Sequence, residues 1–131
     1  MTAKLVINLV LYINRLGLAE GLLLGEASGI PPETVLEMLR ASAARSTAMD
    51  MWGERMVQRR YDDPTSRIRQ HAKDVAQISE LAQEAGLRLL ALPQIERIAE
   101  EARSSGWDDA DNAVVIEVVR RLSGASEGSR T

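Results

Sequence analysis

Lys4 and Asn8 are the residues best placed for chemistry, because they lie four positions apart at the start of an apolar segment. If that segment is helical, both side chains project from one side of its amino-terminal end. The positive end of the helix dipole, and any burial against a partner domain, would favour loss of a proton from a lysine there. Such a lysine can act as a proton donor and acceptor, and the asparagine amide can orient a substrate oxygen. The alternative is that Lys4 solvates the chain start while Asn8 fills a packing gap.

Lys73 and Asp74 form a second candidate pair, in a segment with helical spacing. Consecutive helix residues point about 100° apart, so one of the two can face a ligand while the other does not. From these two residues alone, a solvated charged pair is the simpler interpretation. His71 is the only histidine, so a metal site would need carboxylates gathered from elsewhere. A structural role is therefore favoured for His71, and no metal is expected.

The sequence shows no motif for dinucleotide binding, for cysteine chemistry or for serine–histidine catalysis. The glycines near the chain start fall inside a helical pattern, whereas a dinucleotide-binding motif follows a strand and forms a tight turn. The chain has no cysteine, which excludes disulfides and thiolate metal sites and permits a reducing compartment. A serine–histidine pair cannot be inferred from spacing alone. We expect a cytoplasmic protein.

The composition is that of a globular domain. The 131 residues predict one domain with a modest core, and 45% hydrophobic and 27% charged residues fit a soluble fold. A net charge of −3 gives no reason to expect nucleic acid or an anionic membrane as a partner. Basic residues do cluster locally, and a solvated charged face is the expected role of these residues: Arg55, Arg59, Arg60, Arg67 and Arg69.

Residues 3–29 are apolar enough to suggest a membrane span or a signal peptide. Arg15 and Glu20 would lie near the centre of a span, at a cost of several kcal/mol, and no clear cleavage site follows. We therefore predict a long buried helix. Its glycines recur at every fourth position, which predicts close approach of a neighbouring helix, with the last one capping the helix end: Gly17, Gly21, Gly25 and Gly29.

Helical spacing continues along the rest of the chain. Further helices are predicted after Pro31 and Pro32, after Ser46 as a capping residue, up to Gly86, from Pro93 to Gly106, and over residues 113–122. The last segment is rich in valine, which favours strands, but its apolar positions recur at helical spacing. Capping chemistry at its start is supplied by Asp108, Asp109 and Asp111. The sequence predicts an all-α bundle of about six helices around a long central N-terminal helix, over residues 1–122, with a disordered tail over 123–131.

Read together, the segments resemble the carboxy-terminal helical domain of the β-hydroxyacid dehydrogenases, the family of 3-hydroxyisobutyrate dehydrogenase and tartronate semialdehyde reductase. The implied fold is like that of the carboxy-terminal domain of 6-phosphogluconate dehydrogenase. AKLVINLVL is similar to the family's lysine-x-x-x-asparagine motif, and LAEGLLLGEASGIPPETVLEMLRASAARS to its long helix, turn and second helix. DDPTSRIRQHAKDVAQISELAQEAG resembles its lysine–aspartate helix, and GWDDADNAVVIEVV its final acidic turn and helix. The resemblance covers residues 3 to about 122.

The resemblance implies roles for the candidate residues. Lys4 would be the catalytic lysine, polarising the substrate oxygen and exchanging its proton as hydride moves to or from nicotinamide. Asn8 would help to hold the substrate and the lysine. Lys73 would face the cofactor and substrate cleft, with Asp74 supporting its helix.

The resemblance also implies partners. The family's nucleotide-binding half has no counterpart in the sequence, so NAD or NADP is expected only if such a domain is supplied, and this chain alone is not expected to be active. The helical domain builds much of the oligomer interface in the family, so a homodimer is expected, and a separate Rossmann-domain polypeptide is a second candidate partner. The alternative function is a non-catalytic dimerisation or interaction module that retains only the fold.

Overall fold

The computed structural model describes residues 1–125, which form helices, turns and loops. The α-helices are α1 (Thr2–Ala27), α2 (Pro32–Arg40), α3 (Glu54–Gln58), α4 (Ile68–Ala85), α5 (Leu92–Ser104) and α6 (Val115–Ser123). A π-helical turn, η1 (Met49–Gly53), leads into α3, and a 3-10 turn, η2 (Asn112–Val114), leads into α6. Within the described range there is no strand, only an isolated bridge between Arg67 and Asp111. The all-α prediction is therefore confirmed, including the helix over the valine-rich segment.

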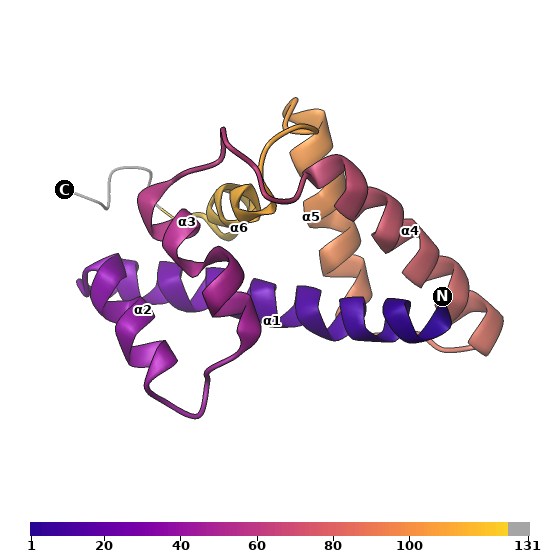
Figure 1. Cartoon of the computed structure of the whole chain (residues 1–131), viewed down its shortest axis with the longest axis horizontal. Helices are drawn as coiled ribbons and strands as arrows, with labels where there is room; N and C mark the ends of the chain where they lie inside the picture. Colours follow the sequence, from indigo (N-terminus) through magenta and orange to yellow (C-terminus); the bar gives the residue numbers. More distant parts are fainter. Residues whose placement is uncertain (126–131) are drawn as a thin grey trace.

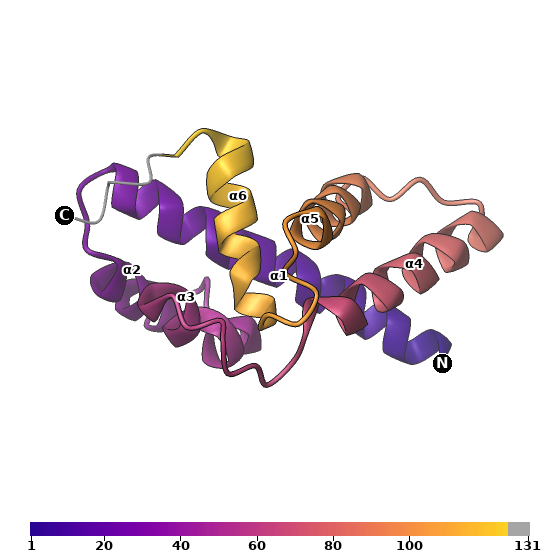
Figure 2. The same ribbon diagram turned by 90° about the horizontal axis from the view of Figure 1, so that it is seen from above.

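Helix α1 runs the length of the molecule and the other helices pack along it (Figure 1). Its carboxy-terminal half packs against α2 and η1, and its amino-terminal half against α4 and α5, while α6 crosses its middle (Figure 2). Two hydrophobic clusters result. The larger one joins α1 to α2, α3 and α6, and the smaller one joins the start of α1 to α4 and α5. The prediction of a long central N-terminal helix is confirmed.

Four helices end in the same glycine motif. The glycine that follows each helix has a positive φ, and the next residue's N–H donates to the carbonyl five residues back; the glycines are Gly29, Gly86, Gly106 and Gly124. Glycine adopts this left-handed conformation without a Cβ penalty, so it satisfies helix-end carbonyls efficiently. The caps predicted at the first three positions are confirmed. Helix α6 includes Ser123, and residues 126–131 of the predicted tail lie outside the described residues.

The glycines that recur along α1 allow close approach of another helix only at the carboxy-terminal end of α1. A Cβ added at Gly25 would overlap the Val35 side chain on α2, whereas one at Gly21 would make an ordinary 3.7 Å contact with Leu39. A Cβ at Gly17 would meet no atom within 4 Å. The prediction of a continuous glycine contact is therefore wrong at Gly17, because no helix approaches that position closely.

This difference predicts opposite effects of one substitution at two glycines. Gly17→Ala is expected to raise the free energy of unfolding by about 0.5–1 kcal/mol, because alanine loses less backbone entropy than glycine in a helix. Gly25→Ala is expected to lower it by about 1–3 kcal/mol, because Val35 must shift to admit the methyl group. Urea unfolding measures both changes. Shifts of the same sign for the two variants would contradict the packing between α1 and α2.

The side-chain cap predicted at Ser46 is wrong. Ser46 directly precedes helical residues 47–58, and its carbonyl accepts a hydrogen bond from the Met49 N–H at 3.1 Å. Its hydroxyl, however, is buried without a hydrogen-bond partner in the described part of the chain. The π-helical turn that follows changes the register of the backbone donors, so the usual capping geometry is not available.

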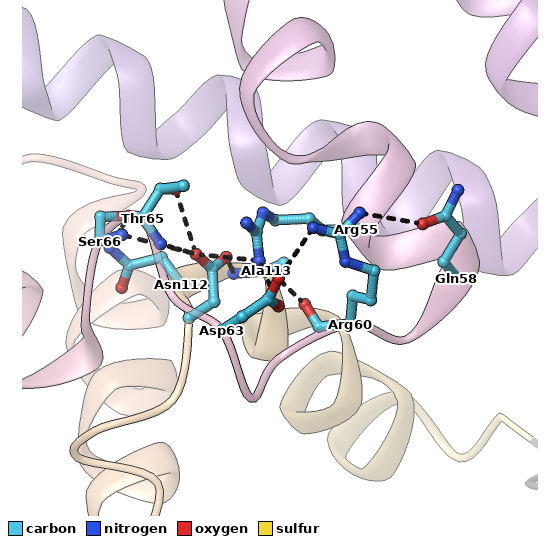
Figure 3. Close-up of polar contacts among 9 residues, drawn as sticks. Arg55, Gln58, Arg60, Asp63, Thr65, Ser66, Asn112 and Ala113 are labelled. Carbon is cyan, nitrogen blue, oxygen red and sulfur yellow. Dashed lines mark hydrogen bonds and ion pairs between the residues drawn. The ribbon is translucent and has the colours of Figure 1, made fainter.

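Asp111 ties the loop before α4 to the start of α6. One carboxylate oxygen accepts from the Thr65 N–H at 2.9 Å and its hydroxyl at 3.3 Å, and the other accepts from the Ala113 N–H at 2.8 Å. Arg55 lies 3.8 Å away, and Figure 3 shows these neighbours converging between the two segments. Asp111 is completely buried. Its predicted capping role is confirmed at η2, the turn that leads into α6, and its contacts with Thr65 fix the loop just before α4.

Asp108 and Asp109 do not cap the last helix, contrary to the prediction. Asp108 pairs with Arg103 at 2.9 Å, and Asp109 pairs with Arg69 at 2.9 Å. The other arginines of the basic cluster also lie within 4.0 Å of a carboxylate, in the pairs Arg55–Asp63, Arg60–Asp63, Arg59–Glu117 and Arg67–Asp109. The predicted solvated face therefore holds for Arg60, Arg67 and Arg69, whereas Arg55 and Arg59 are largely covered, with side chains 12% and 26% exposed.

Helix α1 is long and apolar enough to cross a membrane by length and composition alone. Its most apolar 18-residue window has a mean hydropathy of 1.4, and 33% of that window is buried. Core helices of soluble proteins meet the same criterion, and Arg15 in the middle of α1 is buried against other helices. The apolar residues of α1 thus fall into two groups: one is buried within the bundle, and the other is exposed near the chain start.

Candidate functional site

Helices α1 and α4 pack antiparallel, with polar residues along their contact. The Tyr12 hydroxyl on α1 donates to Asp74 Oδ2 on α4 at 3.0 Å. One turn further along α1, Arg15 Nη2 lies 3.2 Å from both ring nitrogens of His71. Residue 12 of α1 thus lies beside residue 74 of α4, and residue 15 beside residue 71, so the two chains run in opposite directions. The start of α1 and the end of α4 accordingly lie at the same end of the molecule (Figure 1).

The three predicted site residues lie on these two helices but do not meet. Lys4 and Lys73 are exposed and Asn8 is half-buried, and neither lysine makes an ion pair within residues 1–125. In the antiparallel register, Lys73 is level with residue 13 of α1, roughly 13 Å along the helix axis from Lys4. Asn8 lies one turn from Lys4 on the side of α1 that carries Tyr12. The roles of Lys4, Asn8 and Lys73 therefore stay predictions. None of the described helices buries the Lys4 side chain.

Asp74 is not part of a solvated charged pair. Its side chain is buried, and it accepts hydrogen bonds from Tyr12 at 3.0 Å and from Gln70 Nε2 at 3.3 Å. Burial, followed by the Asp74 charge, raises the pKa of the Tyr12 hydroxyl, so this phenol stays a donor. Of the two neighbouring residues, only Lys73 faces solvent. Asp74 holds α4 against α1 and so determines where Lys73 projects.

The Arg15–His71 contact is the buried polar feature that the sequence patterns did not reveal. The Arg15 side chain is 2% exposed and lies over two aromatic rings, 4.5 Å from the Trp52 centroid and 5.0 Å from that of Tyr12. Burial lowers the pKa of Arg15 to about 10, which leaves it charged at neutral pH. The only available signal was an arginine three positions after a tyrosine within an apolar run. Three-residue spacing places both side chains on one helix face.

His71 is structural, as predicted. Its ring is buried and packs edge-on against Tyr12, with the centroids 4.4 Å apart. Burial, and secondarily the Arg15 charge, hold the pKa of His71 well below its usual range, so the ring is neutral and accepts from Arg15. Within residues 1–125, no group of three or more histidine, aspartate or glutamate side chains is arranged to hold a metal ion.

Acidification should therefore destabilise the fold through His71. Below about pH 6.5 the unfolded chain binds a proton that the folded chain does not, so stability falls by up to about 1.4 kcal/mol per pH unit. Urea unfolding between pH 7.5 and 5 measures this slope, and His71→Gln is expected to flatten it. Carboxylates with arginine partners, such as Asp63 and Asp109, have lowered pKa values and titrate below this window. If stability fell with pH equally steeply in the unaltered protein and in His71→Gln, His71 would not be the source of the pH dependence.

An apolar face of α1 lies exposed beside Lys4. It consists of Val6, Ile7, Val10 and Ile13, which are 54%, 64%, 53% and 37% exposed. These positions recur at helical spacing on the side of α1 that faces away from Tyr12 and α4. Large aliphatic side chains gathered on one exposed helix face are typical of a surface that contacts another protein domain.

Comparison with known proteins assigns the chain to a family. Residues 1–119 match the family described as NAD-binding of NADP-dependent 3-hydroxyisobutyrate dehydrogenase. The chain is 32% identical over 124 residues to 2-(hydroxymethyl)glutarate dehydrogenase of Eubacterium barkeri, covering 94% of this chain and 41% of that protein. It is 27% identical over 124 residues to a probable mitochondrial 3-hydroxyisobutyrate dehydrogenase-like protein of Arabidopsis thaliana, covering 95% of this chain and 37% of that one.

A solved structure shares the fold. The crystal structure of 3-hydroxyisobutyrate dehydrogenase from Salmonella typhimurium matches with a TM-score of 0.83 at 20% identity, over 89% of this chain and 41% of that chain. The present chain thus spans less than half the length of the relatives that it matches. With nearly all of its described residues covered by the family match, the chain belongs to the β-hydroxyacid dehydrogenases, the NAD(P)-dependent family that includes 3-hydroxyisobutyrate dehydrogenase.

Proposed function

We propose that this chain is the substrate-binding and oligomerisation domain of an NAD(P)-dependent dehydrogenase acting on a short 3-hydroxy acid. The observation that carries the proposal is the family match over residues 1–119. Its support in the structure is the position of Lys4 and Asn8 at the exposed start of α1. The Lys4 side chain borders an apolar face that the described helices leave uncovered, and Asn8 lies one turn further along α1 on the side of Tyr12.

Lys4 handles the proton in this proposal. In the oxidation direction its neutral amine would accept the proton of the substrate hydroxyl as the carbon that bears this hydroxyl gives up a hydride. In the reduction direction the ammonium returns that proton to the carbonyl oxygen. Asn8, one turn away, orients the substrate oxygen through its amide. The hydride acceptor or donor would be a nicotinamide cofactor held by a nucleotide-binding domain.

The described residues do not by themselves fit a dinucleotide. They form no parallel sheet from which a glycine-rich loop could lead into a helix, the arrangement that holds a pyrophosphate. Lys73 is exposed and makes no ion pair within the described chain, so its ammonium is available at the edge of a cofactor site. We therefore propose that a nucleotide-binding domain supplies the rest of that site.

The exposed face of α1 is the proposed contact for that domain. Docking there would bury Val6, Val10 and Ile13 and would bring the cofactor towards Lys4, which borders the face. The same docking would exclude water from the amine, the condition that a proton-transferring lysine requires. A homodimer and a cytoplasmic location complete the proposal. Sedimentation at tens of micromolar, roughly within the usual affinity range, should show more than a monomer.

Complementation tests the proposal. The chain is mixed with the nucleotide-binding domain of the Eubacterium barkeri relative, and NAD(P)-dependent oxidation of short 3-hydroxy acids is followed by nicotinamide absorbance. Activity is expected from the mixture and from neither part alone. A chain carrying Val10→Glu is the matched control, since a charge on the apolar face should prevent docking. No activity from the mixture or from a direct fusion of the two parts, together with binding to an unrelated protein, would favour the non-catalytic module.

A further inference from the structure

Arg15 is a buried cation without a carboxylate partner. Within residues 1–125, no carboxylate oxygen lies within 4.0 Å of its guanidinium group. Asp111 attracts Arg15 only over a longer distance, and its charge is shared with Arg55 at 3.8 Å. The Asp74 carboxylate is held by Tyr12. A buried ion without a partner of opposite charge is strongly destabilising, so a negative charge bound beside Arg15 would stabilise the fold.

The donors of Arg15 are only partly used. The guanidinium carbon lies over the Trp52 and Tyr12 rings, 4.5 Å and 5.0 Å from their centroids, and such contacts supply no hydrogen-bond acceptor. Nη2 reaches His71 at 3.2 Å. Nη1 is buried and has no hydrogen-bond acceptor in the described part of the chain. One charged donor group therefore remains for a ligand.

A small cavity adjoins these groups. Its volume is about 10 Å³, and its polar lining residues are Tyr12, Arg15 and His71. That volume admits about one water-sized particle. The remaining wall is aliphatic, formed by Leu16, Ile95, Ile98, Val115 and Val119. The three polar residues suffice to hold a water molecule, but a water molecule would not neutralise the cation, whereas a monoatomic anion gains directly from the Arg15 charge.

We infer that Arg15 and the adjoining cavity form a binding site for a single monoatomic anion of the halide class, bordered by α1, α4, α5 and α6. The anion accepts from Nη1 of Arg15 and neutralises the guanidinium group inside the bundle. This site lies away from Lys4 and does not depend on the proposed dehydrogenase activity. Its consequence is a fold whose stability depends on the type of anion present.

Thermal unfolding of the full chain at constant ionic strength tests the site. Potassium gluconate, whose anion is too large for the cavity, is replaced stepwise by potassium chloride or bromide. The expected result is a saturable rise in Tm, with the folding equilibrium constant raised about elevenfold at ten times the Kd. Arg15→Met, which keeps an unbranched side chain but removes the guanidinium group and its charge, is expected to abolish the dependence. Arg97→Met removes an exposed charge on α5 and should leave the dependence intact.

A bromide-soaked crystal provides a second readout that does not require a variant to fold. Anomalous density beside Nη1 of Arg15 is expected, and its absence would overturn the inference. Equal Tm values in gluconate and chloride for the unaltered protein would also overturn it. So would a halide effect of the same size in Arg15→Met, since that effect could not arise at Arg15.

Discussion

Lys4→Ala is expected to lower kcat by about 10²–10⁴-fold in the protein assembled with a nucleotide-binding domain, which is the range for loss of a general acid or base. The side chain is exposed and makes no ion pair among the described residues, so its removal should change stability by less than about 0.5 kcal/mol. Steady-state kinetics with a short 3-hydroxy acid, together with urea unfolding of the same variant, separate the two effects.

Two further variants give this prediction its controls. Lys4→Arg keeps the positive charge, but a guanidinium group does not give up its proton, so kcat should stay low. Lys73→Ala should raise the KM for the cofactor more than it lowers kcat, because Lys73 is proposed to contact the cofactor and not the reacting oxygen. Full activity in Lys4→Arg would show that the residue supplies only charge.

Asp111→Ala is expected to lower the free energy of unfolding by about 3–5 kcal/mol, the largest loss from any single site described. The substitution removes the acceptor for the N–H groups of Thr65 and Ala113 and for the Thr65 hydroxyl, and it leaves the buried side of Arg55 without this carboxylate. Each buried donor left unsatisfied costs about 1–3 kcal/mol. Urea unfolding at pH 7 measures the change.

The free energy of unfolding of Asp111→Asn should lie between those of the unaltered protein and Asp111→Ala. The asparagine amide oxygen still accepts a hydrogen bond, but its NH₂ group faces a backbone donor. Asp109→Ala is the matched control. Asp109 makes an exposed ion pair with Arg69 at 2.9 Å, and exposed pairs of this kind contribute little to stability because water and salt screen them. If the Asp111 and Asp109 variants lost similar stability, the loop would not depend on the buried carboxylate.

Local patterns in the sequence predicted most of the fold. Apolar residues at helical spacing identified the helices, even over the valine-rich segment that became α6 (Val115–Ser123). Gly86 and Gly106 marked helix ends, because a left-handed cap is a local requirement that glycine meets at least cost. These features depend on neighbours within a few residues. They could therefore be predicted without knowing which helices pack together.

Features that depend on distant residues were not predictable in the same way. Asp74 is buried because Tyr12, 62 positions away, donates to it, and no spacing within α4 reveals that partner. Gly17 differs from Gly25 only in whether α2 lies against it. The burial of Arg15 likewise depends on Trp52 and His71, which lie far from it in the sequence, and a charged residue in an apolar run does not identify these partners.

The candidate site was predictable only through the family resemblance. Spacing placed Lys4 and Asn8 on one side of a helix start, but it favoured a merely structural role for both. The structure leaves the reaction untested, because the face that borders Lys4 is open. Under the proposed function a second domain completes the site, and few chemical signals are then expected within residues 1–125.

Chemical rescue of Lys4→Ala tests the central claim most directly. The variant is assembled with the nucleotide-binding domain, and the rate of hydride transfer is measured with increasing ethylamine, or with tetramethylammonium as a cation that carries no proton. A proton-transferring Lys4 predicts a low rate that ethylamine restores in proportion to its concentration and that tetramethylammonium does not restore. An undiminished rate in Lys4→Ala, or equal recovery with both cations, would contradict the claim.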